Sequence, residues 1–396
     1  MVDCGKLRLA TETCGVRSLH AHTFNAERGG SDVMFSTTVA LLRSQGHDVQ
    51  TIERDAARVK GKLAEARADV QSLHSRAARI ETRRLLRDFR PDVVHLHNLY
   101  PLLSPSILEP CRRAGVPIVM SLEDHTLACP TGALFRDGQL CRLCLGGHEY
   151  RAVLTRCSGS YVASAALALR TALPRVRGTF IENVDAFITP SLMLKQFYVT
   201  EGYPESRIVH IPNFVETPAT AASPERGSYV AYLGRISEEK GIATLLEAAA
   251  RCGVPLQIAG SGPMACKLRE VPANVRLVGR LSHREALEFL LDARCVVVPS
   301  VCAESFGLSA AEAMALGIPV IASRIGGLPE TVPPDAGSFV PPGDAAALAD
   351  AMTLMWENPG AAEALGAAGR AFALREYSKE TYAARLLLLY HSLCKN

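Results

Sequence analysis

The chain alternates short apolar runs with segments of helical periodicity along most of its length. Runs rich in Val, Ile and Leu predict buried strands, and apolar residues spaced three or four apart predict amphipathic helices. Strands are expected at residues 16–24, 49–52, 92–97, 116–125, 185–190, 207–213, 229–235, 255–260, 275–280, 296–299 and 320–323. Helices are expected at residues 31–44, 54–90, 104–115, 191–202, 241–253, 264–271, 284–294, 308–316, 345–356, 361–376 and 378–392. Strict alternation of this kind predicts parallel sheets.

The alternation is interrupted between residues 214 and 228, where Pro, Ala and Ser accumulate without periodicity, as in a linker. Because 396 residues exceed one comfortable hydrophobic core, we expect two α/β domains, each a Rossmann-like parallel sheet. The expected parts are a disordered leader (1–15), an N-terminal domain (16–214) with a cysteine-rich insertion (129–157), a linker (215–227), a C-terminal domain (228–376) and a final helix (377–396).

Composition narrows the class of protein. Apolar residues make up 48% and charged residues 21% of the chain, as in ordinary soluble domains. The net charge of +3 is too small to indicate a nucleic-acid partner. No apolar run is long enough to span a membrane, and the N-terminus lacks the apolar core of a secretion signal. A cytoplasmic location is therefore expected.

A basic stripe runs along the predicted helix at 54–90. Its arginines recur at three- and four-residue spacing and are Arg76, Arg79, Arg83, Arg87 and Arg90. A solvated helix face is the favoured interpretation. Contact with an anionic lipid surface or a polyphosphate remains open, and with it a peripheral position on the inner membrane face.

Two acids mark the stretch from 296 to 323. Glu304 lies in the loop after an apolar run, and Glu312 lies eight positions later within a short helix. Open α/β sheets bind ligands at such loop-to-helix junctions, where the first free amides of the helix can hold an anion. Glu312 would then be placed to accept hydrogen bonds from vicinal hydroxyls, as in a ribose. The alternative is a core helix with one solvated glutamate.

Two further strand ends in the same half carry anion-handling residues. Arg235 and Lys240 flank a helix start and could together neutralise a diphosphate, or form surface ion pairs with neighbouring glutamates. Gly260 and Gly262 would let a ligand approach the backbone. The segment 260–265 fits G-x-G-x-x-A, but as a dinucleotide fingerprint it is weak, because a proline stands at the helix start and no acid ends the next strand.

The first half offers two candidates at strand ends. His125 is predicted to close a strand beside Asp124, where it could bind a sugar hydroxyl, take part in proton transfer, or serve the structure alone. Gly29 and Gly30 form a flexible turn after the first strand and could approach a phosphate or an acceptor.

Taken together, these segments resemble the retaining GT-B glycosyltransferases of family four, also called group 1. The matching segments are GGSD with its helix, GHDV, VVHLHN, the strand ending at His125, YLGRISEEKG, IAGSGP, VRLVGRL and PSVCAESFGLSAAEAMALGIPVIASRIGGLPE. The resemblance extends from Val16 to about Tyr382. It implies two Rossmann-like domains facing a central cleft, with the last helix crossing back to the first domain. Two departures are Ser31-Asp32 after the glycine turn and Phe214 after Pro-Asn.

The resemblance also implies roles for individual residues. Arg235 and Lys240 would hold the donor diphosphate and stabilise it as it leaves. Glu312 would bind the ribose, and Arg280 and Leu281 would lie near the base. The loop segment would face the transferred sugar with Glu304 and with the amides of Phe306, Gly307 and Leu308.

His125 would approach that sugar from the other domain, and Gly30 would lie on the same side. The implied donor is a nucleotide-diphosphate sugar of unspecified base. The implied acceptor is a glycan, a lipid-linked sugar or a small molecule. No cofactor or catalytic metal is required for this reaction. The sequence does not fix the oligomeric state.

Four cysteines in the insertion have metal-ligand spacing. They are Cys129, Cys141, Cys144 and Cys157, in the pattern C-x11-C-x2-C-x12-C. Such a set can hold a structural zinc ion, with His148 as a further candidate ligand. Free buried thiols and redox-labile pairs are the alternatives. A subset of the family carries a similar insertion, so the resemblance implies that it shapes the acceptor side.

Three hypotheses from different classes follow. The first is a hexosyl-type glycosyltransferase acting in polysaccharide, glycolipid or natural-product biosynthesis. The second keeps the fold but makes the protein a nucleotide-sugar epimerase or a phosphorylase. The third is a non-catalytic subunit that binds a nucleotide sugar. Activity on the donor without an acceptor separates the second from the first, and binding without turnover marks the third.

Overall fold

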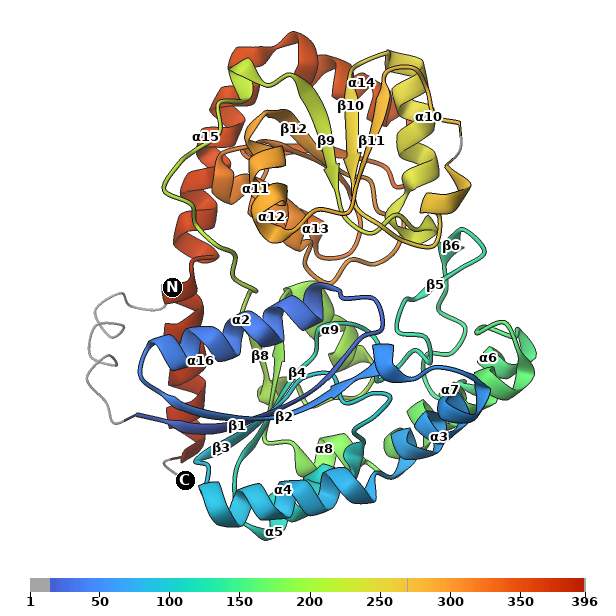
Figure 1. Ribbon diagram of the computed structural model, residues 1–396, viewed down its shortest axis with the longest axis vertical. Helices are drawn as coiled ribbons and strands as arrows, with labels where there is room; N and C mark the ends of the chain where they lie inside the picture. Colours follow the sequence, from blue (N-terminus) through green and yellow to red (C-terminus); the bar gives the residue numbers. More distant parts are fainter. Residues whose placement is uncertain (1–14, 269, 395–396) are drawn as a thin grey trace. The chain divides into compact units, whose positions relative to one another are not determined.

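The structure is a computed structural model that describes residues 15–394 except residue 269 (Figure 1). The chain folds into two compact units. The first unit takes the chain up to Ala133, Arg142–Ile211 and everything from Tyr382 onward, and the second takes Leu134–Cys141 and Pro212–Thr381. The expected leader at 1–15 lies almost wholly outside the described residues, and the other expected domain boundaries stay predictions.

A parallel sheet of six strands forms the centre of the first unit, in the order β2-β1-β3-β4-β7-β8. Its strands are β1 (Arg17–Phe24), β2 (Asp48–Asp55), β3 (Val93–Leu96), β4 (Ile118–Ser121), β7 (Ala186–Thr189) and β8 (Ile208–His210). All six were predicted. Two short strands, β5 (Phe135–Arg136) and β6 (Gln139–Leu140), form an antiparallel hairpin within the insertion.

Helices lie on both sides of this sheet (Figure 1). They are α2 (Gly30–Ser44), α3 (Lys62–Leu73), α4 (Arg76–Phe89), α5 (Leu108–Arg113), α6 (Tyr150–Leu154), α7 (Tyr161–Val176), α8 (Thr179–Asn183), α9 (Leu192–Thr200) and the part of α16 (Lys379–Cys394) from Tyr382 onward. The pattern gave no prediction for α6, α7 and α8.

The prediction of one helix over 54–90 is wrong. Strand β2 continues to Asp55, whose carboxylate accepts a hydrogen bond from the amide of Ala57 and starts a 3-10 turn, η2 (Ala56–Arg58). Gly61 then adopts a positive φ of 89°, and Ser75 caps α4 by accepting from the amide of Ala78. These local hydrogen bonds compete with helix continuation and outweigh the helical propensity of the Ala, Arg and Glu residues.

The second unit repeats the architecture with a sheet in the order β11-β10-β9-β12-β13-β14, again parallel throughout. Its strands are β9 (Tyr229–Leu233), β10 (Leu256–Ala259), β11 (Val275–Gly279), β12 (Ala293–Val298), β13 (Val320–Ser323) and β14 (Gly337–Val340). Its helices are α10 (Ile242–Cys252), α11 (His283–Leu291), α12 (Leu308–Leu316), α13 (Leu328–Thr331), α14 (Ala345–Glu357) and α15 (Pro359–Glu376). Strand β14 and α13 were not predicted.

The predicted helix at 264–271 is wrong, since the described residues of this range form only a 3-10 turn, η7 (Ala265–Lys267). The amide of Met264 donates instead to the carbonyl of Ile236 in the neighbouring loop at 3.0 Å. Two apolar clusters fill the unit: one lies under α12 and α15, and the other under α10 and α14.

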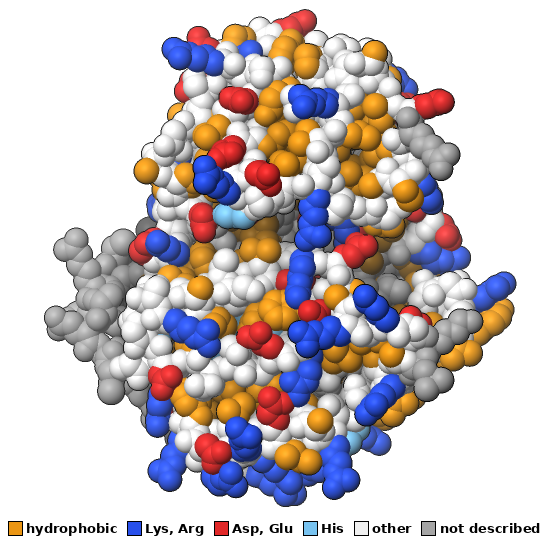
Figure 2. All heavy atoms as spheres, viewed as in Figure 1, with side chains coloured by type: hydrophobic (Ala, Val, Ile, Leu, Met, Phe, Trp, Pro, Cys, Tyr) orange, Lys and Arg blue, Asp and Glu red, His pale blue; other side chains and the backbone are white. Residues whose placement is uncertain are grey.

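The surface carries charges of both signs, interspersed over the face shown in Figure 2. No helix among the described residues is long and apolar enough to cross a membrane.

A layer of histidines lies buried on one face of the first sheet. The register pairs His20 of β1 with His95 of β3; His22 of β1 and His97, the residue after β3, lie beside them, and all four are at most 3% exposed. Nδ1 of His20 lies 3.1 Å from Nε2 of His97, and Nδ1 of His95 lies 2.6 Å from the hydroxyl of Tyr390 in α16. The layer thus bonds the C-terminal helix to the centre of the sheet.

We expect the stability of the first unit to fall steeply as the pH drops below about 6.5. Burial and the charge of Arg43 lower the pKa of His20 to about 3, and burial holds the pKa values of His95 and His97 well below the ordinary range. Below about pH 6.5 these rings take up protons when the unit unfolds. Their contribution to the free energy of unfolding is therefore complete above about pH 6.5, and below it each ring lowers that free energy by about 1.4 kcal/mol for every pH unit.

Urea titrations followed by circular dichroism at about pH 7.5, 6 and 5 measure this slope. His97→Gln should reduce the slope, whereas His148→Gln, which changes an exposed ring, should leave it unchanged. A wild-type slope that matches ordinary acid titration of surface groups would contradict the expectation.

Candidate functional site

The predicted anion-handling residues of the second unit lie on both sides of its switch point. From β9 the chain adds β10 and β11 on one side, and then crosses to add β12, β13 and β14 on the other. Ligands of open α/β sheets bind outside the carboxyl ends of the strands at this place. Arg235 and Lys240 follow β9, and Glu304 follows β12, so the fold brings them to the same edge.

Lys240 and Glu304 form an ion pair across the switch point. The ammonium group of Lys240 donates to Oε1 of Glu304, and the hydroxyl of Ser300 donates to the same oxygen at 2.6 Å. The side chains are 25% and 12% exposed. Burial alone would raise the pKa of Glu304, but the charge of Lys240 and these hydrogen bonds hold it below the ordinary value. Burial also disfavours the charged form of Lys240, but the charge of Glu304 outweighs this effect and raises the pKa of Lys240.

Arg235 occupies a more open position. Its guanidinium pairs with Glu239 at 2.9 Å and is 51% exposed, while the hydroxyl of Ser237 donates to the same glutamate oxygen at 2.7 Å. The surface ion pair considered for this segment therefore forms at Arg235, whereas Lys240 reaches Glu304 instead. An arginine so exposed can leave Glu239 for a phosphate at little cost.

The glycines after β10 serve the packing of two loops against each other. A Cβ on Gly260 would lie 1.8 Å from the carbonyl oxygen of Gly234, and one on Gly262 would lie 2.4 Å from that of Ile236. The amide of Ile236 donates to the carbonyl of Ser261 at 2.9 Å. The missing side chains thus seat the loop after β10 on the loop that carries Arg235. Close packing of the two loops is enough to explain Gly260 and Gly262, without the predicted approach of a ligand.

The loop before α12 turns at Gly307, where φ is +96° and a Cβ would lie 2.6 Å from the side chain of Leu328. Phe306 is 4% exposed and packs edge-on against Tyr377, with ring centroids 5.1 Å apart. Its side chain is therefore part of the core. The amides of Gly307 and Leu308 precede the first intrahelical hydrogen bond of α12 and have no helical acceptor, which suits them to an anion or a hydroxyl.

Glu312 lies in the second turn of α12 and is half-buried. Burial raises the pKa of its carboxyl to about 7, with a further upward contribution from Glu216 and a downward one from His283. Arg280 and Leu281, the residues placed near a base, directly follow β11; the arginine is exposed and the leucine half-buried.

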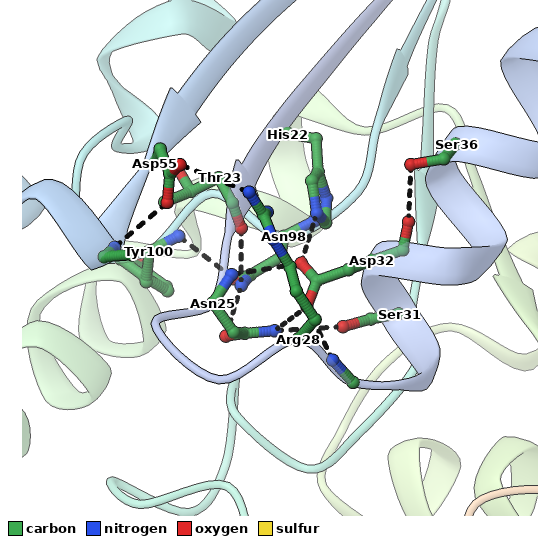
Figure 3. Close-up of polar contacts among 12 residues, drawn as sticks. His22, Thr23, Asn25, Arg28, Ser31, Asp32, Ser36, Asp55, Asn98 and Tyr100 are labelled. Atoms are coloured by element: carbon green, nitrogen blue, oxygen red, sulfur yellow. Dashed lines mark hydrogen bonds and ion pairs between the residues drawn. The ribbon is translucent and has the colours of Figure 1, made fainter. Parts of the chain in front are cut away.

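The switch point of the first unit, between β1 and β3, carries polar residues that the pattern did not identify (Figure 3). The buried carboxylate of Asp32 in α2 accepts hydrogen bonds from Nε2 of His22 at 2.9 Å and from the amides of Asn25 and Gly29 at 3.0 and 2.8 Å. The side-chain amide of Asn98 donates to the side-chain oxygen of Asn25 at 3.3 Å. Both asparagines follow strand ends, which is the signal that could have identified them.

The glycine turn leaves the start of α2 open. Gly29 caps the helix and Gly30 begins it, and both are exposed. A Cβ on Gly29 would meet no atom within 4 Å, so its missing side chain serves no packing inside the chain. The carboxylate of Asp32 is already hydrogen-bonded to the start of its own helix and to neighbouring residues. A ligand could therefore use the open space beside the glycine turn, but not this carboxylate.

His125 lies beyond a strand, not at its end as predicted. Strand β4 ends at Ser121, because the chain then turns: Asp124 accepts from the amide of Thr126 at 2.8 Å, and the carbonyl of His125 accepts from Cys129 at 2.8 Å. The ring is 2% exposed, packs edge-on against Phe197 at 4.7 Å, and has no described partner for Nε2. Burial lowers the pKa of His125 although Asp124 opposes the shift, so the ring is neutral near pH 7.

A small polar cavity of about 30 Å³ lies in the first unit beside these residues. Its lining includes Ser31, His97, Asn98, Tyr100, Asp124 and Tyr198. Nδ1 of His97 and the hydroxyl of Tyr100 are buried there without a hydrogen-bond partner in the described chain. Such a cavity has room for about one or two waters or one polar group of a ligand.

Two of the four cysteines of the insertion, Cys129 and Cys144, are buried, and the four do not form a metal-ligand cluster among the described residues. The group that does have close ligand atoms is His20, His95 and His97. The rings of His95 and His97 stack with centroids 4.2 Å apart and planes inclined by 26°. Because a metal must lie near the plane of each ring that binds it, these two rings cannot direct nitrogens at one ion. We assign that cluster to hydrogen bonding, and the cysteine zinc site stays a prediction.

Comparison with known proteins identifies the family. Residues 28–218 match the model described as Glycosyltransferase Family 4, and residues 215–372 match Glycosyl transferases group 1. A GDP-mannose-dependent monoacylated alpha-(1-6)-phosphatidylinositol monomannoside mannosyltransferase of Corynebacterium glutamicum is 32% identical over 46% of this chain and 56% of its own. Glycogen synthase of Mycobacterium tuberculosis is 28% identical over 77% of this chain and 69% of its own. The matched region thus spans little more than half of the first of these relatives.

Solved structures show the same fold. Anabaena HepE in complex with UDP has a TM-score of 0.67 at 15% identity, covering 95% of this chain and all of its own. Sucrose-phosphate synthase from Thermosynechococcus elongatus has a TM-score of 0.68 at 20% identity, covering 95% and 99%. Two Rossmann-like parallel-sheet units of this kind define the GT-B class. The chain belongs to the group 1, family 4 glycosyltransferases, whose two models together cover residues 28–372.

We expect Glu312→Gln to stabilise the second unit above about pH 7 and to leave it unchanged below about pH 4.5. The folded-state pKa of Glu312 is raised to about 7. The contribution of this side chain to the stability of the second unit is therefore complete at low pH and is lost as the pH rises through that value. The glutamine cannot ionise, which should restore roughly 1–3 kcal/mol at about pH 8. Urea titrations followed by the fluorescence of Trp356, the single tryptophan, report on this unit. The exposed Glu247→Gln should show no such pH-dependent gain.

If the cysteines bind zinc, purified protein should contain about one equivalent of metal per chain. Cys141→Ser with Cys144→Ser should abolish it, and Cys266→Ser, an exposed thiol of the second unit, should not. Elemental analysis measures both, and a content far below one equivalent in the wild type would remove the zinc prediction.

Proposed function

We propose that this protein transfers a sugar from a nucleotide-diphosphate sugar to an acceptor hydroxyl, with retention of anomeric configuration. The observation that carries the proposal is the Lys240–Glu304 pair beside Arg235 at the switch point of the second unit. Two cations there match the charge of a diphosphate, and a carboxylate beside them suits the hydroxyls of a sugar. Membership in the family supports the reaction class.

The chemistry proposed for this site is electrostatic. As the bond between sugar and diphosphate breaks, negative charge builds on the diphosphate, and Lys240 and Arg235 would stabilise it. The acceptor hydroxyl would attack from the same face of the sugar. No covalent nucleophile is assigned, and this reaction requires no cofactor or catalytic metal.

The nucleoside would lie along the ends of β11 and α12. Glu312 would accept hydrogen bonds from the ribose hydroxyls, and Arg280 with Leu281 would border the base. Glu304 and the amides of Phe306, Gly307 and Leu308 would meet the transferred sugar. This division of roles places the two cations at the diphosphate, and a carboxylate with neutral amide donors at the sugar.

The acceptor would bind to the first unit, where His125, Gly30 and the polar cavity lie. Its class is a glycan, a lipid-linked sugar or a small molecule, in polysaccharide, glycolipid or natural-product biosynthesis. One relative is named for a phosphatidylinositol monomannoside acceptor and another as a glycogen synthase, which supports glycans and lipid-linked sugars alike. We propose a cytoplasmic protein that contacts the inner membrane face.

Replacing either member of the ion pair should abolish most donor chemistry. A panel of nucleotide sugars is first screened for slow hydrolysis, which needs no acceptor. With the donor found, Lys240→Met and Glu304→Gln should each lower hydrolysis by about 100- to 1000-fold, because each removes a charge that the leaving diphosphate or the sugar requires. Lys267→Met, an exposed lysine of the same unit, is the matched control.

Normal turnover in both variants would refute the assigned roles. Conversion of the donor to another sugar without an acceptor would indicate an epimerase, and sugar release that depends on free phosphate would indicate a phosphorylase. Calorimetric binding of the donor with no product under any acceptor would indicate a non-catalytic subunit.

A further inference from the structure

Helix α7 exposes several of its larger apolar side chains. Its buried face carries the small side chains of Ser164, Ala168 and Thr171. Val162, Leu169 and Val176, spaced seven residues apart along the opposite face, are 81%, 49% and 73% exposed. Burial of Val and Leu is the main driving force of folding, so a helix turned this way leaves stabilisation unused within the chain. A binding partner that covers these side chains would provide this stabilisation.

The neighbouring segments extend this apolar surface. Of the 16 large hydrophobic side chains that are exposed in the described chain, seven lie between residues 143 and 176. They are Leu143, Tyr150, Leu154, Tyr161, Val162, Leu169 and Val176. Helices α6 and α7 pack against each other, and Figure 2 shows hydrophobic and basic side chains next to each other at the edge of the molecule where α6 lies.

The same segments are strongly basic. Six arginines and one acid occur from residue 142 to residue 177. The acid, Glu149, is buried and accepts a hydrogen bond from Arg175 at 3.1 Å, so it offers no negative charge to a partner. Arg156 lies over the ring of Tyr161 at 4.9 Å, which places a cation directly beside the exposed apolar residues. We call the seven hydrophobic residues together with Arg142, Arg151, Arg156 and Arg177 the α6–α7 surface.

Charge decides which body this surface fits. A second copy docking through the same patch would bring two clusters of arginines together, and the cores of dimer interfaces are depleted in charge. An anionic bilayer matches both properties: its headgroups attract arginines, its acyl boundary takes Val and Leu, and tyrosines settle between the two.

The arginine stripe of α4 fits a bilayer less well. Arg79 and Arg83 both pair with Glu109, at 2.9 and 3.3 Å, and Arg87 pairs with Asp88 at 2.8 Å. Its cations are thus partly neutralised, which supports the solvated helix face favoured from the sequence.

We propose that the α6–α7 surface docks the protein on an anionic lipid bilayer. Docking would bring the first unit to the membrane without a spanning helix, so the surface would suit a lipid-linked acceptor. The proposal itself does not rest on the transferase activity, because it depends only on lipid charge and exposed apolar area.

Co-sedimentation with lipid vesicles tests it, using the full chain. Phosphatidylcholine vesicles that contain phosphatidylglycerol should bind the wild type, and pure phosphatidylcholine vesicles should bind it far less. Val162→Ser and Leu154→Ser should each weaken binding by about tenfold. Arg151→Gln and Arg156→Gln should each weaken it by about fivefold and reduce its sensitivity to salt.

Matched controls keep the result interpretable. Leu354→Ser, which changes a side chain of the second unit that is 67% exposed, should bind vesicles like the wild type. Circular dichroism and nucleotide-sugar hydrolysis without lipid should be unchanged in every surface variant, so a failure of docking is distinguishable from a failure of the proposed transferase.

Three results would overturn the proposal. One is equal binding to neutral and anionic vesicles, or to neither. Another is vesicle binding that survives all four surface substitutions. The last is a dimer in light scattering that Val162→Ser dissociates, which would assign the surface to a second copy.

Discussion

The ion pair between Lys240 and Glu304 joins the two loops that leave the second sheet in opposite directions. One partner follows β9 and the other follows β12, so the pair spans the place where the strand order reverses. Both side chains are largely buried, and removing either would leave an uncompensated charge, a loss that commonly costs about 3–5 kcal/mol. The glycines after β10 then let a third loop pack closely on the loop after β9, because any side chain at Gly260 would collide with the backbone of Gly234. Charge and close packing together fix the edge of the sheet.

The first unit is also held together by buried polar contacts, but these contacts join neutral side chains. Four buried histidines lie in its central strands or directly after them, and burial keeps the pKa values of at least three of them far below neutrality. As neutral rings they bond to one another and to Tyr390, which helps to hold the last helix on the sheet without any ion pair in this layer. A buried polar network of this kind is stabilising only while every member keeps its protonation state. The network therefore favours one arrangement of the strands and the last helix, but it makes the unit less stable at low pH.

The periodicity of the chain identified eleven of the strands of the two parallel sheets, because buried parallel strands are nearly continuous apolar runs. It did not identify β14, whose four residues are Gly, Ser, Phe and Val, nor α7, whose exposed apolar face removes the contrast that an amphipathic helix shows. The candidate site was found at Arg235, Lys240, Glu304 and Glu312 because charges at strand ends are visible in a sequence. The bonding of Lys240 to Glu304 and of Asn25 to Asn98 depends on which strands become neighbours, and spacing along the chain carries no such information.

The two units use the same topology for different chemistry. At the switch point of the second unit the polar groups are mainly ions, and the hydroxyl of Ser300 donates to one of them, Glu304. At the switch point of the first unit, Asp32 is fully engaged by its own helix start and by His22, and Asp55 pairs with Arg28, while amides, ring nitrogens and the unbonded hydroxyl of Tyr100 lie beside them. Ions are the groups that recognise phosphate, and neutral donors and acceptors are the groups that recognise sugar hydroxyls without the desolvation cost of a charge. This division of polarity supports a donor bound by its phosphates to the second unit and an acceptor bound by its hydroxyls to the first.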